Sequence, residues 1–129
     1  MIVADCAAVV DALTGFPGTD DLRATLAEED LHAPTLLDYE VVSALRGLAR
    51  RGHLSTSRAY DALTDFDALS IQRWPSAAAL RRRALSLRDN LTAYDAAYVA
   101  LAEALGCPLV TRDSRLARSR GHDAEIRVV

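Results

Sequence analysis

Hydrophobic residues along this chain recur with two alternating spacings. Short apolar runs typical of buried strands stand at residues 1–4, 31–33, 69–74, 109–111 and 126–129. Between these runs, apolar positions repeat every three or four residues, which predicts helices over 7–13, 20–27, 35–51, 56–66, 75–88, 92–104 and 114–120. Strands that alternate with helices over residues 1–129 predict one domain with a three-layer α/β/α fold around a central, mostly parallel sheet.

The stretch 91–113 carries the clearest signals in the chain. Thr92 occupies the position of a helix N-cap, Gly106 is a stop signal for that helix, and the apolar strand 109–111 follows. Asp95 falls in the first turn of the predicted helix, and Asp113 comes two residues after the predicted strand. We therefore expect one carboxylate at each end of this helix–strand unit.

Two further acids have a similar placement. Asp5 directly follows the first predicted strand, and Glu40 lies on the flank of the apolar stripe of helix 35–51, roughly 60° from Leu37 at about 100° per residue. Ligands of parallel α/β folds bind at the carboxyl ends of the strands. Carboxylates brought together there raise each other's pKa unless a cation intervenes, and oxygen ligands suit Mg²⁺ or Mn²⁺.

Each acid also has a purely structural interpretation. Asp5 and Asp113 could cap the helices that follow them, and Asp95 stands three residues after Thr92, as in a capping box. Glu40 could pair with an arginine. Helix caps are far commoner than metal ligands, so the residue pattern alone leaves both interpretations open.

Four segments of the chain carry the acids and their neighbours: MIVAD (1–5), PTLLDYEVVSAL (34–45), LTAYDAAYVALA (91–102) and LVTRD (109–113). These segments resemble those of PIN-domain ribonucleases, specifically the VapC-type toxins of type II toxin–antitoxin pairs. Their order, their spacing and the total length of the chain fit that family, and the resemblance covers essentially the whole chain.

The resemblance implies a function and a site. The acidic quartet of the family corresponds to Asp5, Glu40, Asp95 and Asp113, and Mg²⁺- or Mn²⁺-dependent hydrolysis of RNA, by in-line attack of water on phosphorus, would follow. Asp5, Asp95 and Asp113 are expected to hold the metal, and Glu40 to bind a second ion or to position the water. Thr111 is expected to support the acids by hydrogen bonding.

The chain departs from the family pattern at one position. The family often carries a hydroxyl residue two positions after the first Asp, where this chain has Ala7. The resemblance further implies a cognate antitoxin protein that blocks the site, and a homodimer as the toxin unit.

Composition excludes several other classes of protein. All 15 basic residues are arginine, so a phosphoacceptor receiver domain, which needs a lysine, does not fit. A haloacid-dehalogenase-type phosphatase would need a second Asp at position 7. No apolar run is long enough to span a membrane and no basic leader opens the chain, so we expect a cytoplasmic protein. The two cysteines, 101 positions apart at Cys6 and Cys107, do not have the spacing of a zinc site.

The net charge of −3 is not that of a typical nucleic-acid-binding domain. Among the arginines, Arg112 and Arg115 are the best candidates for contact with RNA because they flank Asp113. The aromatic residues are expected to pack in the protein rather than to stack on bases; they are Tyr39, Tyr60, Trp74 and Tyr94. The remaining alternative from another functional class is a PIN-fold module that binds RNA or a partner without cleaving it.

Overall fold

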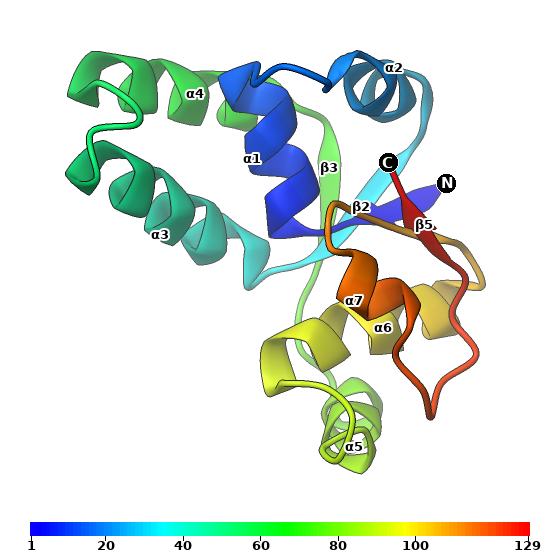
Figure 1. Ribbon diagram of the computed structural model, residues 1–129. Coiled ribbons are helices and arrows are strands. Elements are labelled where there is room, and N and C mark those ends of the chain that lie inside the picture. The colour runs from blue at the N-terminus through cyan, green and yellow to red at the C-terminus, as the bar shows by residue number, and fades with distance from the viewer.

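The computed structural model describes residues 1–129, in which five strands alternate with seven helices (Figure 1). In chain order the elements are β1 (Ile2–Ala4), α1 (Cys6–Thr14), α2 (Asp20–Glu28), β2 (Leu31–Pro34), α3 (Leu37–Arg50), α4 (Thr56–Ala68), β3 (Ile71–Trp74), α5 (Ala78–Ser86), α6 (Ala93–Leu105), β4 (Leu109–Thr111), α7 (Ser114–Ala117) and β5 (Ile126–Val128). None of the helices combines the length and the apolar character needed to cross a bilayer.

The strands form one sheet in the order β3-β2-β1-β4-β5, and every neighbouring pair is parallel. Figure 1 shows α1 to α4 on one side of the strands and α5 to α7 on the other. The predicted three-layer α/β/α fold is therefore confirmed, with a sheet that is entirely rather than mostly parallel. Since all strands point the same way, their carboxyl ends meet at a single edge of the sheet.

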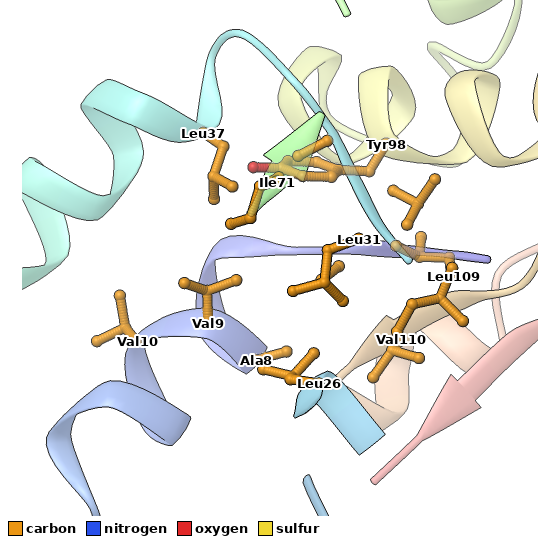
Figure 2. Close-up of a cluster of buried hydrophobic side chains, with 14 of the residues drawn as sticks. Ala8, Val9, Val10, Leu26, Leu31, Leu37, Ile71, Tyr98, Leu109 and Val110 are labelled. Carbon is orange, nitrogen blue, oxygen red and sulfur yellow. The ribbon is translucent and has the colours of Figure 1, made fainter. Parts of the chain in front are cut away.

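The core lies on both faces of β1 and β4. Each of the three residues of both strands is at most 1% exposed, because helices cover the sheet on either side. Figure 2 shows Val9 and Val10 of α1 on one side of β1 and Tyr98 of α6 on the other. These side chains belong to one cluster of 27 buried residues. Burial on both faces explains why the strands appear in the sequence as unbroken apolar runs.

Three predicted helices are shorter in the structure, and α3 (Leu37–Arg50) loses only the ends of the predicted range 35–51. Helix α5 begins at Ala78 rather than at residue 75, because Ala77 keeps an extended backbone (φ −124°, ψ 156°) and its side chain offers no cap. Helix α7 ends at Ala117 rather than at residue 120. The amide of Arg118 bonds to the carbonyls of Arg115 and Leu116, and this contact closes a tight last turn.

The packing prediction is wrong for three of the four aromatic residues. Tyr39, Tyr60 and Tyr94 are 83%, 69% and 67% exposed. Tyr39 lies between the buried Leu37 and Val41, and Tyr60 lies opposite the buried face of α4, so both side chains turn to solvent. Tyr94 shares a helix face with the buried Leu101 but stands in the first turn of α6. Only Trp74 is partly buried, and its ring nitrogen Nε1 donates to Nδ1 of His32 at 3.0 Å.

Candidate active site

Asp5 stands at the carboxyl end of β1 and is the N-cap of α1. Its Oδ1 accepts a hydrogen bond from the amide of Ala8 at 2.9 Å. Its Oδ2 accepts one from the hydroxyl of Thr111 at 2.5 Å. The register that pairs Ala4 with Val110 brings Asp5 beside Thr111. Both oxygens of this half-buried carboxylate are thus fixed by the sheet and the first turn of α1.

Thr111 connects two of the acids. It is the last residue of β4, fully buried, and besides donating to Asp5 its hydroxyl oxygen accepts the amide of Asp113 at 3.0 Å. One side chain therefore sets the position of Asp5 and the turn on which Asp113 stands. Sequence reasoning selected Thr111 as a supporting residue, and these are the contacts through which it can act.

Asp113 caps α7 and is held by an arginine of the same helix. Its Oδ1 accepts the amide of Arg115 at 2.9 Å. The guanidinium of Arg115 reaches Oδ1 and Oδ2, each at 3.2 Å. These contacts hold the pKa of Asp113 below its usual value. The Arg115 side chain is 83% exposed, so this ion pair can be exchanged at little cost.

Glu40 lies in the first turn of α3, just beyond the end of β2, and is half-buried. Its partner is a tyrosine rather than an arginine: the hydroxyl of Tyr98 donates to Oε1 at 2.6 Å. Tyr98 is 2% exposed and lies one helical turn after Asp95 on α6. Sequence reasoning gave Tyr98 no role, although residues three apart on a helix share a face.

Asp95 is exposed in the first turn of α6. Thr92 caps this helix, and its hydroxyl oxygen accepts the amide of Asp95 at 3.2 Å. The predicted N-cap and the predicted stop at Gly106, which adopts φ 64°, are both confirmed. The carboxylate of Asp95 is left free to face its neighbours.

Asp5 interacts electrostatically with each of the other three acids. Burial raises the pKa of Asp5, and the charges of Asp95 and Asp113 raise it further. Burial also raises the pKa of Glu40, and there the charges of Asp95 and Asp5 add to the effect. The structure therefore brings all four acids to the same edge of the sheet. Two of them are helix caps as well, so capping and clustering are not alternatives.

The donors of this cluster are carboxylate oxygens, the ligands that Mg²⁺ and Mn²⁺ prefer. No three Asp, Glu, His or Cys side chains are already gathered closely enough to chelate one ion. Asp113 is engaged by Arg115 through both of its oxygens. The chemistry of the site fits a divalent cation, and full chelation requires Arg115 to release Asp113.

The second arginine singled out in the sequence has a different environment. Nε of Arg112 donates to Oδ2 of Asp11 at 3.1 Å, and its Nη1 donates to the main-chain oxygen of Val129. These bonds tie β4 to α1 and to the C-terminal residue. Arg112 is therefore committed to contacts within the fold, whereas Arg115 lies at the surface beside the acids.

Comparison with known proteins agrees with this architecture. The PIN domain family matches residues 2–121. Ribonuclease VapC12 of Mycobacterium tuberculosis is 41% identical over 129 residues, which cover 100% of this chain and 99% of that protein.

Two solved structures share the fold. PAE2754 from Pyrobaculum aerophilum superposes with a TM-score of 0.70 at 25% identity and covers 97% of this chain and 81% of its own. A toxin–antitoxin complex from Klebsiella pneumoniae superposes with a TM-score of 0.60 at 18% identity and covers 91% and 90%. The chain therefore belongs to the PIN-domain family and, by its full-length similarity to Ribonuclease VapC12, to the VapC ribonucleases within it.

Proposed function

We propose that this protein is a metal-dependent endoribonuclease that acts in the cytoplasm as the toxin of a type II toxin–antitoxin pair. The observation that supports this function best is the electrostatic cluster of Asp5, Glu40, Asp95 and Asp113 at the carboxyl edge of the sheet. Grouping negative charges at a half-buried site destabilises the fold unless a cation neutralises them. A site of this kind is suited to hydrolysis of a phosphodiester.

Asp5, Asp95 and Asp113 would hold Mg²⁺ or Mn²⁺, and Glu40 would bind a second ion or orient the attacking water. Such a cation, when bound, activates water and stabilises the negative charge that develops on the phosphate. The chain's own residues prepare the site: Thr111 fixes Asp5 through its hydroxyl. Arg115, once released from Asp113, is free to contact an RNA phosphate as a fork-shaped donor.

The proposed partners are a cognate antitoxin and a second copy of the chain. The toxin–antitoxin complex that shares this fold supports the first. A groove of about 570 Å³ beside the acids supports the second, since its lining is mostly apolar and includes the 67% exposed Leu85 of α5 and Tyr94 of α6. Apolar side chains left in water at one face are typical of a surface that another protein covers.

The decisive experiment is RNA cleavage by the purified protein in Mn²⁺ and in EDTA, beside the Asp5→Asn variant. We expect cleavage by the wild type in Mn²⁺ only, and none by the variant. Equal decay in both samples would indicate a contaminating nuclease. RNA binding without Mn²⁺-dependent cleavage would favour a non-cleaving PIN module, and sequencing of RNA ends after brief expression would identify the cut site.

A further inference from the structure

Tyr98 provides the hydrogen bond that the structure gives to the carboxylate of Glu40. Its hydroxyl lies 2.6 Å from Oε1, and the tyrosine is 2% exposed. In Figure 2 its ring lies within the core cluster, with the hydroxyl oxygen on the side nearer to Leu37 at the start of α3. Packing of the ring therefore fixes the donor, and the donor in turn restricts Glu40.

The hydrogen bond between Tyr98 and Glu40 joins two helices that each carry an acid of the cluster. Glu40 and Tyr98 are 58 residues apart and belong to α3 and α6. Asp95 stands on α6 as well, one turn before Tyr98, so the same helix carries one acid of the cluster and orients another. No bond to the second oxygen of Glu40, Oε2, is formed within the protein, which leaves that oxygen available to a ligand.

We propose that Tyr98 is a positioning residue of the active site, which holds Oε1 of Glu40 so that Oε2 faces the other acids. A flexible glutamate in the first turn of a helix would otherwise sample several rotamers, and most of them point to solvent. Residues that orient metal-binding carboxylates in this way affect metal affinity strongly. The inference rests on the proposed function, because it takes Glu40 as a member of the site.

The test is a double-mutant cycle on divalent-cation affinity rather than on activity. Binding of Mn²⁺ is followed by the loss of the free-ion electron paramagnetic resonance signal in wild type, Tyr98→Phe, Glu40→Gln and the double variant. Tyr98→Phe removes only the hydroxyl. Tyr60→Phe is the matched control, since Tyr60 is 69% exposed on α4 and takes no part in the site.

We expect Tyr98→Phe to weaken Mn²⁺ binding about tenfold in the wild type, and less than about twofold when Glu40 is already Gln. Tyr60→Phe should bind as the wild type does. An equal loss in both backgrounds, or no loss in either, would overturn the role of Tyr98. If Glu40→Gln binds Mn²⁺ as the wild type does, Glu40 is not a metal ligand, so this inference and the proposed second-ion role of Glu40 both fail. The proposed ribonuclease activity is judged separately, by RNA cleavage in Mn²⁺.

A second measurement covers the case in which Tyr98→Phe folds poorly. Wild-type protein labelled with ¹³C at the tyrosine ring carbon that bears the hydroxyl gives four resonances, one for each tyrosine. Phe variants of the exposed Tyr39, Tyr60 and Tyr94 identify the fourth by elimination. That Tyr98 resonance should move on titration with Mg²⁺ while the Tyr60 resonance does not. A Tyr98 resonance that stays in place through saturation would overturn the proposal.

Discussion

The hydroxyl of Thr111 donates to Oδ2 of Asp5, although 106 positions separate the two residues in the chain. Parallel pairing of β1 with β4 produces this contact, and the fully buried Thr111 also accepts the amide of Asp113. Thr111 therefore holds both Asp5, which follows β1, and Asp113, which follows β4. A substitution of Thr111 tests directly whether this support matters for the site.

Thr111→Val should lower RNA cleavage about tenfold and destabilise the fold by about 1–2 kcal/mol. The change keeps the shape of the side chain but leaves Oδ2 of Asp5 and the amide of Asp113 without this partner. Cleavage rates and urea unfolding measure the two effects. Thr14→Val is the matched control: Thr14 is buried at the end of α1 and donates to the carbonyl of Val10 at 2.8 Å. It should lose stability and keep activity; equal activity losses in both variants would contradict a role in the site.

Replacing two of the acids should change stability in opposite directions. Burial raises the pKa of Asp5, so its ionised form destabilises the fold, whereas Arg115 lowers the pKa of Asp113, so its ionised form stabilises the fold. In EDTA near pH 7 we therefore expect Asp5→Asn to be more stable than the wild type and Asp113→Asn to be less stable.

Both differences should shrink as the pH falls. Stability from a protonated Asp5 is fully present below the ordinary aspartate pKa of 3.8 and is lost as the pH rises through the raised value. Stability from an ionised Asp113 is present above 3.8 and is lost as the pH falls through the lowered value. Urea unfolding at several pH values between 3 and 8 checks both; a gain for Asp5→Asn that persists below pH 3.8 would show that desolvation of the charge is not its cause.

Arg115→Gln should have opposite effects on two ligands. Removal of the guanidinium frees Oδ2 of Asp113 and leaves on Oδ1 only the bond from the amide of residue 115, so Mn²⁺ should bind about two- to fivefold more tightly. RNA, measured in EDTA by fluorescence anisotropy, should bind more weakly. The salt slope of RNA binding should fall by about 0.7, because the variant neutralises one phosphate fewer.

A general loss of folding in Arg115→Gln would weaken the binding of both Mn²⁺ and RNA. Tighter Mn²⁺ binding together with weaker RNA binding therefore distinguishes the proposed role of Arg115 from misfolding. Arg58→Gln on α4 is the control, because this exposed arginine contributes no side-chain bond to the acids. Tighter Mn²⁺ binding with unchanged RNA affinity would show that Arg115 is a counter-ion only.

Leu85→Glu should break the proposed homodimer. Leu85 is 67% exposed on α5 and lines the apolar groove beside the acids, where a carboxylate could not be buried without a partner. Sedimentation velocity over a range of concentrations should give a dimer for the wild type and a monomer for the variant. Tyr60→Glu, on an exposed part of α4, should remain dimeric. A wild type that is monomeric at all concentrations would rule out the homodimer.

The local residue pattern was enough to predict most of the fold. Unbroken apolar runs predicted β1 and β4, and the cap Thr92 and the stop Gly106 defined the bounds of α6 almost to the residue. These signals act within a few residues, so they can be read without knowing the rest of the chain. The bounds of α5 and α7 were less accurate, because no capping side chain marks the start of α5 and a tight backbone turn ends α7 early.

By itself the sequence determined the elements, their alternation and the four acids that its resemblance to a nuclease family singled out. Only the tertiary structure decided how those acids are held: Asp5 by Thr111, Glu40 by Tyr98 and Asp113 by Arg115. It also decided that three tyrosines are exposed and that Arg112 is engaged with Asp11. The physical reason is distance along the chain, because strand register and helix packing create the contacts of Thr111 and Tyr98, and neither follows from local propensity.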